Sequence, residues 1–270
     1  MRTGPETRVY VSVSARPGRF GATVYGALFE RYGIDAVYLP RPAPSEARAV
    51  TDSVRALSIA GCSVSSPHKR AVIESLDVVD AGADAAQSVN TIVRTEDGRL
   101  AGYSTDVDGV VGALGGVSVR TAVVYGAGGV LGAAVVALRR LGAERIVVCA
   151  RSLARAREEA ARFGVEHADA EEAASGSHDV LVNATPVGRT AEGCEEVERL
   201  LAGARVLLDM PVSARATHLS ERARAMGIDV RDGVAMCVHQ VCAQARLYLG
   251  REVPVEIVRE IVEGTYLRGA

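Results

Sequence analysis

The chain contains a single lysine, Lys69, and this is the first residue whose type suggests chemistry. Lysine and arginine together number 31, so every other basic residue is arginine. Arginine can replace lysine wherever only a positive charge is needed, but it does not release a proton near neutral pH. We therefore predict that Lys69 stands where proton transfer by an ammonium group is required. The alternative is an ordinary charge on the surface of a helix.

A glycine-rich turn provides the second chemical signal. The apolar run Thr121–Tyr125 is typical of a strand, Gly126-Ala-Gly-Gly-Val-Leu-Gly132 follows it, and Val130–Leu141 has the pattern of a helix. A strand, a glycine turn and a helix let backbone N–H groups approach a pyrophosphate closely. The sequence thus predicts a dinucleotide site, with a tight turn that binds nothing as the alternative. The residues predicted to contact the phosphates are Gly126, Ala127, Gly128, Gly129 and Val130.

The end of the next predicted strand, Arg145–Cys149, indicates which dinucleotide binds. Sites for NAD usually carry Asp or Glu there, to bind the ribose hydroxyls. This chain has Arg151 and Ser152 instead, with Arg155 one helical turn further on. Two guanidinium groups suit a 2′-phosphate, so we predict NADP as the cofactor. The alternative is that both arginines are solvated surface charges.

Apolar, β-rich runs alternate with amphipathic stretches over nearly the whole chain, which predicts an α/β fold. The pattern restarts near residue 105. This predicts a mixed α/β domain at 1–104, a Rossmann-type domain at 105–231, and C-terminal helices at 232–270 that return to the first domain. The turn signal Glu96-Asp97-Gly98 predicts a hairpin. Further predicted strands are Val9–Ser14, Ala36–Leu39, Gly61–Ser65, Ser88–Arg94, Leu100–Tyr103, Val180–Asn183 and Val206–Asp209. Further predicted helices are Gly21–Tyr32, Ser45–Leu57, one that begins near Pro67, Asp106–Leu114, Ser152–Phe163, Gly233–Leu249 and Pro254–Glu263.

Composition and charge limit the kinds of partner and cofactor that we expect. The formal net charge of −2 gives no reason to expect nucleic acid or an anionic membrane as partner, and no apolar run reaches the ~18 residues of a membrane span. The first residues lack the apolar core of a signal peptide, so we expect a cytoplasmic protein. The five cysteines form no CxxC pair and the histidines are dispersed, which predicts reduced thiols and no metal. A small molecule is the expected partner, for a monomer or a homodimer.

Four segments that carry polar residues follow one another along the chain in the order of a known family pattern. They read Gly61-Cys-Ser-Val-Ser-Ser-Pro-His-Lys69, Ser88-Val-Asn-Thr91, Tyr103-Ser-Thr-Asp106 and Asp232-Gly-Val-Ala-Met-Cys-Val-His-Gln240. With them the chain resembles the shikimate dehydrogenase family, whose pattern is G-x-N-V-T-x-P-x-K, A-x-N-T, N-T-D and D-G-x-x-M-L-V-x-Q. In addition, Val182-Asn-Ala-Thr185 and Ala150-Arg-Ser152 resemble the family's N-A-T and N-R-T segments.

The resemblance implies an NADP-dependent oxidoreductase that moves hydride between NADP(H) and a ring hydroxyl or ketone, 3-dehydroshikimate to shikimate. Such a reaction belongs to the shikimate pathway of aromatic amino acid biosynthesis. Lys69 matches the catalytic lysine and Asp106 its partner. A carboxylate favours the charged lysine, and the ammonium group can protonate the oxyanion that hydride transfer creates. By the same resemblance Asn90, Gln240 and Ser65 bind the substrate, and Asn183 and Thr185 lie beside the cofactor.

Departures from the family pattern concern the substrate. Shikimate dehydrogenases have a Ser-x-Ser-Pro segment whose hydroxyls bind the substrate carboxylate, and here Phe20 and Ala22 occupy the two serine positions. Losing two charge-assisted hydrogen bonds, each worth ~1.5–3 kcal/mol, is enough to change a preference. We expect Arg16, Arg19, Thr23 or neighbouring backbone to bind the carboxylate instead. The family's asparagine, threonine and tyrosine at three further positions are replaced by Ser63, Ser65 and Val212.

The Ala-Arg-Pro motif at 15–17 brings the chain closer to the divergent shikimate dehydrogenase-like branch. Quinate, aminoshikimate or another cyclic hydroxy acid are therefore alternative substrates. A catalytically weak NADPH-binding regulatory homologue is an alternative of another class. A methylenetetrahydrofolate dehydrogenase has a similar architecture, but the match of Lys69, Asp106 and Gln240 argues against it.

Overall fold

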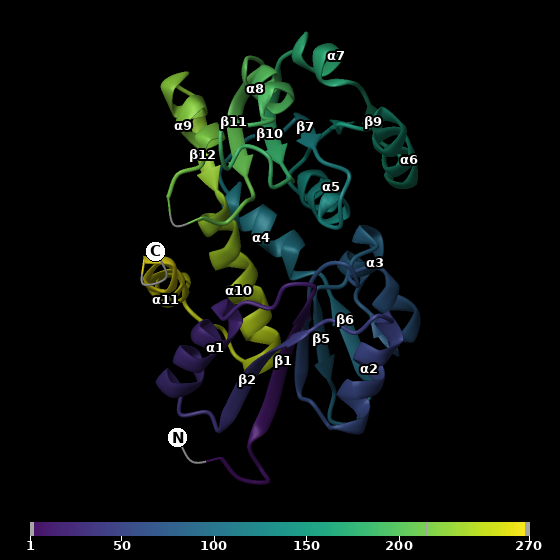
Figure 1. The fold of residues 1–270 in the computed structure, drawn as a ribbon, viewed down its shortest axis with the longest axis vertical. Helices are drawn as coiled ribbons and strands as arrows, with labels where there is room; N and C mark the ends of the chain where they lie inside the picture. The colour runs from purple at the N-terminus through teal and green to yellow at the C-terminus, as the bar shows by residue number, and fades with distance from the viewer. Residues whose placement is uncertain (1–2, 214, 268–270) are drawn as a thin grey trace. The chain divides into compact units, whose positions relative to one another are not determined.

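The structure is a computed structural model that describes residues 3–213 and 215–267 (Figure 1). It contains two compact units, each built on a six-stranded sheet. Among the described residues, the first unit comprises 3–105 and 241–267 and the second 106–240. The second boundary falls inside helix α10 (Gly233–Leu249) rather than at the predicted 231/232. The start of α10 packs within the second unit, since a Cβ on Gly233 would lie 2.5 Å from the backbone oxygen of Met210.

The sheet of the first unit is mixed, with the strand order β2-β1-β3-β5-β6-β4. Strand β1 pairs in parallel with β2 and β3, whereas β5 runs antiparallel to both β3 and β6. The predicted hairpin around Asp97 is therefore confirmed, as the connection between β5 and β6. The strands are β1 (Arg8–Ser14), β2 (Ala36–Pro42), β3 (Gly61–Val64), β4 (Val78–Val79), β5 (Thr91–Arg94) and β6 (Leu100–Tyr103).

The two faces of this sheet differ in chemistry because successive strand residues point to opposite sides. One face is aliphatic: Val11, Val13 and Cys62 pack there against Val50 and Val54 of α2. The other face carries Tyr10 and Tyr38, which contact Tyr25 of α1 and Tyr248 of α10 through their rings. The helices of the unit are α1 (Phe20–Arg31), α2 (Ala47–Ala56), the 3₁₀ helix η1 (Ala71–Ser75), α3 (Ala81–Ala86), the last part of α10, and α11 (Val255–Leu267).

The prediction of a helix that begins near Pro67 is wrong. The chain makes turns there and forms only η1. The carbonyl oxygen of Lys69 accepts a 2.7 Å hydrogen bond from the N–H of Val89, and His68 Nε2 contacts the carbonyl oxygen of Pro44 at 2.7 Å. These long-range contacts hold the Lys69 segment against the start of β5 and replace a local helical ladder.

The sheet of the second unit is entirely parallel, with the strand order β12-β11-β10-β7-β8-β9. Counted from β7, this is the order of a Rossmann-type sheet, whose direction of winding reverses between β7 and β10. The strands are β7 (Thr121–Tyr125), β8 (Arg145–Cys149), β9 (Glu166–His167), β10 (His178–Asn183), β11 (Ala204–Asp209) and β12 (Asp229–Asp232). The helices are α4 (Thr105–Ala113), α5 (Leu131–Arg140), α6 (Leu153–Phe163), α7 (Ala170–Ala174), α8 (Glu195–Leu201), α9 (His218–Ala225) and the start of α10.

The predicted α/β class and the Rossmann-type sheet are confirmed. All five cysteines are free thiols. Within the described residues, no helix combines the length and apolar character needed to cross a membrane.

The tyrosine face of the first sheet depends on one glycine. A Cβ on Gly61 would lie 2.5 Å from Cε1 of Tyr248, whose ring is buried and cannot retreat. We expect Gly61→Ala to lower the free energy of unfolding by about 1–3 kcal/mol, the usual cost of overpacking a core. Urea unfolding followed by circular dichroism measures the change.

Gly26 of α1 is the matched control, because a Cβ there meets no atom within 4 Å. Gly26→Ala is expected to leave the stability unchanged or to raise it by about 0.5–1 kcal/mol. Equal destabilisation by the two substitutions would contradict the proposed packing constraint.

Candidate functional site

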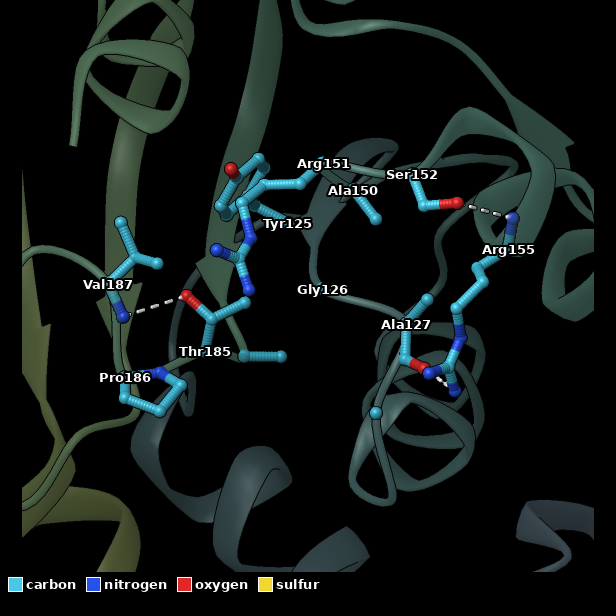
Figure 2. A pocket seen from close by; sticks show the side chains of 12 residues that line it. Tyr125, Gly126, Ala127, Ala150, Arg151, Ser152, Arg155, Thr185, Pro186 and Val187 are labelled. Atoms are coloured by element: carbon cyan, nitrogen blue, oxygen red, sulfur yellow. Dashed lines mark hydrogen bonds between the residues drawn. The ribbon is translucent and has the colours of Figure 1, made fainter. Parts of the chain in front are cut away.

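A pocket of about 310 Å³ lies at the carboxyl ends of β7, β8 and β10, where the winding of the second sheet reverses (Figure 2). Open α/β sheets bind ligands at this topological switch point. Most residues that the sequence predicted to hold the cofactor line this pocket: Gly126, Ala127, Gly128, Arg151, Ser152, Arg155 and Thr185. Gly129 and Val130 lie next along the chain, and Val130 is the N-cap residue of α5.

Gly126 is the residue on which the pocket's shape depends. Its backbone N–H donates to the carbonyl oxygen of Cys149, the last residue of β8, at 2.7 Å. Its φ is +130°, and a Cβ would lie 2.7 Å from Cγ2 of Thr185. Only glycine satisfies both the backbone conformation and this close approach.

The two predicted arginines approach the pocket from different sides. Figure 2 shows Arg151 reaching toward Thr185, while Arg155 extends toward Ala127. One guanidinium N–H of Arg155 donates to the carbonyl oxygen of Ala127 at 3.4 Å, and Ser152 caps α6 by accepting from the Arg155 backbone N–H at 3.3 Å. None of the lining residues that the structure describes is acidic. The pocket is therefore electrostatically suited to an anion.

Asn183 supports the pocket from behind rather than lining it. Its side chain is fully buried, and its NH₂ group donates to the carbonyl oxygen of Val187 and to Asp209 Oδ1, both at 2.8 Å. Its Oδ1 accepts from the N–H and the hydroxyl of Thr185. With both donors used, Asn183 fixes the loop from Thr185 to Val187, which forms one wall.

Five residues of the pocket were not predicted: Tyr125, Ala150, Ala184, Pro186 and Val187. Each ends a parallel strand or follows one closely, so the rule that ligands bind at carboxyl strand ends could have found them. Tyr125 donates from its hydroxyl to Glu196 at 2.7 Å. Burial, reinforced by that carboxylate, raises the pKa of the phenol, so Tyr125 stays neutral beside the pocket.

The predicted substrate-binding residues of the first unit lie in different environments. Lys69 is half-buried in the turn after β3, and Asn90 is buried just before β5. Ser65 is exposed directly after β3. Thr23 is exposed on α1, where its hydroxyl donates to the carbonyl oxygen of Arg19 at 3.1 Å. The loop before α1 contains Arg16 and Arg19, which are also exposed.

Two predicted site residues belong to the second unit and bind one another. Gln240 of α10 donates from Nε2 to Oδ1 of Asp106 on α4 at 2.8 Å. The helices come close because α4 carries small residues on the contacting side: a Cβ on Gly109 would lie 3.1 Å from Gln240 Cβ. The structure thus brings Asp106 and Gln240 together. The pairing of Asp106 with Lys69 stays a prediction.

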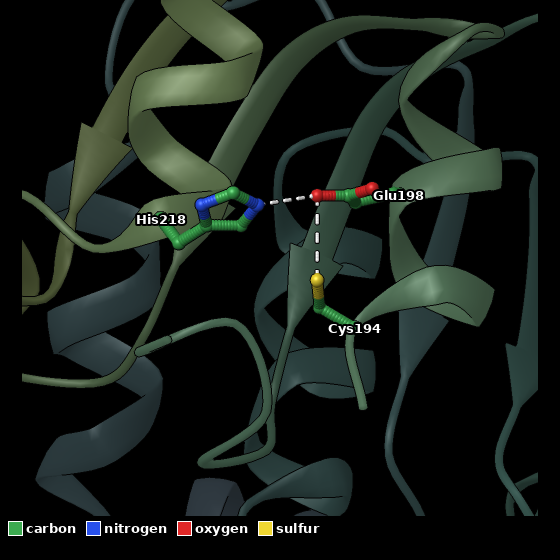
Figure 3. Close-up of side chains that lie close together, drawn as sticks. All are labelled: Cys194, Glu198 and His218. Carbon is green, nitrogen blue, oxygen red and sulfur yellow. Dashed lines mark hydrogen bonds and ion pairs between the residues drawn. The ribbon is translucent and has the colours of Figure 1, made fainter. Parts of the chain in front are cut away.

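A second polar cluster joins α8 to α9, where Cys194, Glu198 and His218 bring their ligand-type atoms within 4.8 Å (Figure 3). Glu198 Oε1 accepts from His218 Nε2 at 2.7 Å and from the Cys194 thiol at 3.3 Å. Burial tends to raise the pKa of Glu198, but these two hydrogen bonds together with nearby positive charge, including that of Arg222, lower it. Burial and Glu198 raise the pKa of Cys194 to about 11. The three groups are therefore joined by hydrogen bonds to the Glu198 carboxylate.

Comparison with known proteins identifies the family. The model of the shikimate dehydrogenase substrate binding domain matches residues 21–92. The NADP(+) shikimate dehydrogenase of Pyrococcus abyssi is 34% identical over 88% of this chain and 90% of its own. The chain belongs to the shikimate dehydrogenase family. A shikimate dehydrogenase-like protein of Haemophilus influenzae is 30% identical over 94% of this chain and 95% of its own.

Solved shikimate dehydrogenases share the fold. The enzyme of Thermus thermophilus in complex with NADP(H) and shikimate is 28% identical and superimposes with a TM-score of 0.79, over 95% of this chain and 98% of that one. In the present chain, the pocket of the second unit fits a dinucleotide phosphate by three criteria. A glycine admits close approach, two guanidinium groups line the pocket, and none of its described lining residues carries a carboxylate.

If Arg151 binds the 2′-phosphate, Arg151→Ala should raise the KM for NADP⁺ about tenfold or more, the value of one charge-assisted hydrogen bond. The KM for NAD⁺, which lacks that phosphate, should stay unchanged. Arg157→Ala is the matched control, because Arg157 is exposed on α6, the helix that follows Arg151, and does not line the pocket. Equal loss with both dinucleotides would show that Arg151 does not read the 2′-phosphate.

Dialysis against EDTA is expected to leave the melting temperature unchanged, because the protonated Cys194 thiol already donates to Glu198. Differential scanning fluorimetry, with elemental analysis of the untreated protein, measures this. One zinc ion per chain, lost together with stability on dialysis, would contradict the hydrogen-bonded cluster and the predicted absence of a metal.

Proposed function

We propose that the protein is an NADP-dependent oxidoreductase that moves hydride reversibly between NADP(H) and a ring carbon of a shikimate-type acid, 3-dehydroshikimate to shikimate. The observation that carries this proposal is the acid-free, arginine-lined pocket at the switch point of a chain that matches an NADP(+) shikimate dehydrogenase over nearly its whole length. The second unit is accordingly the cofactor domain.

Substrate binding is assigned to the first unit. The family model that matches residues 21–92 is that of a substrate binding domain, and this range includes Thr23, Ser65, Lys69 and Asn90. Gln240 is a further proposed substrate ligand. Its amide donates to Asp106 and retains an oxygen that can accept a hydrogen bond from a ring hydroxyl.

In the proposed mechanism Lys69 handles the proton. When bound, NADPH supplies the hydride, and negative charge develops on the ring oxygen. The ammonium group of Lys69 stabilises that charge and transfers a proton to the oxygen, giving the alcohol. Asp106 is the proposed partner of Lys69, as the family resemblance implies. In the reverse direction the neutral amine accepts the proton of the ring hydroxyl.

A second candidate substrate is quinate, aminoshikimate or another cyclic hydroxy acid. It is favoured by the surroundings of the two replaced serine positions, Phe20 and Ala22. Between them, a Cβ on Gly21 would lie 2.6 Å from the ring of Tyr38. The side chains at 20 and 22 supply no hydroxyl donors, and the glycine between them lies against an aromatic ring. A ring acid with a different polar pattern would use Arg16, Arg19 or backbone groups for its carboxylate.

We further infer that the enzyme works in the cytoplasm, in the shikimate pathway that leads to aromatic amino acids, as a monomer or a homodimer. The full-length match to shikimate dehydrogenases supports the pathway. The predicted exclusion of nucleic acid and of membranes as partners rests on the weak net charge.

Lys69→Ala should lower kcat for the ring acid by about 10²–10⁴, the contribution of positioned proton transfer. Lys69→Arg keeps the charge but cannot release a proton, so it should lose nearly as much. The assay is NADP⁺ reduction against shikimate, quinate and amino analogues, with NADPH affinity measured by fluorescence as the folding control.

Unchanged turnover in either variant would remove Lys69 from the mechanism. If the wild type binds NADPH but reduces NADP⁺ with none of the ring acids, the chain is instead a regulatory homologue that has kept the fold.

A further inference from the structure

A directed chain of buried hydrogen bonds runs through the first unit and ends on Asn90. It begins at Tyr25 and Ser63, passes through Gln244 of α10, and reaches Thr91 of β5. The side chains of Tyr25, Gln244, Thr91 and Asn90 are each at least 93% buried. Buried amides and hydroxyls cannot fall back on water, so the orientation of each group is set by its neighbours.

The orientation of the Asn90 amide follows from a donor that cannot reverse. The backbone N–H of Thr105 donates to Asn90 Oδ1 at 2.8 Å, and a backbone N–H can only donate. The Thr91 hydroxyl donates to the same oxygen at 3.0 Å. The NH₂ group therefore points the other way. One of its hydrogens goes to Thr105 Oγ1 at 3.0 Å, and the second is left for a ligand.

Thr91 has one hydroxyl proton, and that proton reaches Asn90 only if no other acceptor takes it. Gln244 does not compete for it in this orientation, because its Nε2 donates to Thr91 Oγ1 at 2.6 Å. If the Gln244 amide were flipped, its oxygen would take the single Thr91 proton and Asn90 would lose a donor. The direction of the Gln244 amide therefore decides where the Thr91 proton goes.

Two hydroxyl groups lie against the oxygen of the Gln244 amide and donate to it. Its Oε1 accepts from Tyr25 at 2.7 Å and from Ser63 at 3.1 Å. Ser63 in turn accepts from Tyr38 at 2.7 Å and contacts the Tyr248 hydroxyl at 3.0 Å. A serine hydroxyl has one proton and two lone pairs, so Ser63 is saturated inside the network and has no capacity left for a ligand.

We propose that Gln244 is a positioning residue: it leaves the Thr91 proton to Asn90 Oδ1 and so reinforces the orientation that the Thr105 N–H imposes, in which Asn90 faces the substrate as a pure N–H donor. The ring atom that faces Asn90 is then a hydrogen-bond acceptor, a hydroxyl or keto oxygen. This inference rests on the proposed function, in which Asn90 binds the ring acid.

Three substitutions in the full-length enzyme test it. Tyr25→Phe removes one donor to Gln244 and keeps the ring that stacks on Tyr38 at 4.8 Å. Thr91→Val removes the hydroxyl that reaches Asn90, and Thr91→Ser restores it. Tyr10→Phe is the matched control, because its equally buried hydroxyl donates at 2.8 Å to the backbone oxygen of Tyr248 and does not reach Gln244.

Tyr25→Phe and Thr91→Val should each raise the KM for the ring acid about three- to tenfold, the effect of weakening one neutral hydrogen bond. The KM for NADP⁺ should not change. Thr91→Ser and Tyr10→Phe should keep the wild-type KM for the ring acid. In an Asn90→Ala background, neither Tyr25→Phe nor Thr91→Val should change that KM further, because the group through which they act is gone.

The inference is overturned if Tyr25→Phe lowers the urea midpoint but leaves the KM where Tyr10→Phe leaves it, since the network is then only structural. It is also overturned if the KM effects persist in the Asn90→Ala background. Should Thr91→Val fail to fold, Tyr25→Phe alone decides between these outcomes. A wild type that turns over no ring acid overturns the proposed function together with this inference, whereas the other results leave the function intact.

Discussion

The close approach of three strand ends at Gly126 is the constraint on which the second unit depends. This one residue directly follows β7, donates its N–H to the carbonyl oxygen of the last residue of β8, and lies against the segment that follows β10. Because no side chain can occupy that place, β7 sits tightly between its two neighbours while the helices that follow diverge. The pocket is the space left by that divergence. The arginines after β8 and the loop fixed by Asn183 then give this space its charge and its walls.

The first unit depends on a different constraint. It buries polar side chains, and each of them must keep the orientation in which its hydrogen bonds are made. An aliphatic face against α2 supplies the apolar burial, and the opposite face places tyrosines beside Ser63, Gln244 and Thr91. Such a network stabilises a fold only if each member is satisfied, since a half-satisfied buried network is worse than an apolar core. Here the hydroxyls of Tyr25, Ser63 and Thr91 each donate to an amide oxygen. The same hydrogen bonds that satisfy these buried groups run in one direction, from Tyr25 through Gln244 and Thr91 to Asn90.

Strands β7 and β8 and helix α10 are predicted to the residue because each has a strong period or an unbroken apolar run. Strands β9 and β12 and helix α9 are short and polar, so tertiary contacts rather than local pattern create them. The prediction of a helix at Pro67 fails for the same reason. The hydrogen bond from Val89 to Lys69 holds this segment in another conformation, although its sequence is typical of a helix start. Among site residues, sequence motifs locate those of the cofactor pocket, because a glycine turn after a strand is a pattern of neighbouring residues. Gln244 could not be found this way, because its partners Thr91 and Tyr25 lie 153 and 219 positions away.

The departures from the family pattern acquire a common physical meaning in this network. Ser63 stands where the family has an asparagine, and its hydroxyl is fully committed to Tyr38, Tyr248 and Gln244. Phe20 and Ala22 flank Gly21, against which the ring of the same Tyr38 packs. Ser63 therefore contacts Tyr38 directly, and Phe20 and Ala22 are the chain neighbours of the glycine that faces the same ring. Lys69, Asn90 and Asp106 lie outside this set of changes. The groups proposed to move a proton are thus retained and those proposed to choose the ring are changed, so the sequence determines the reaction class better than it determines the substrate.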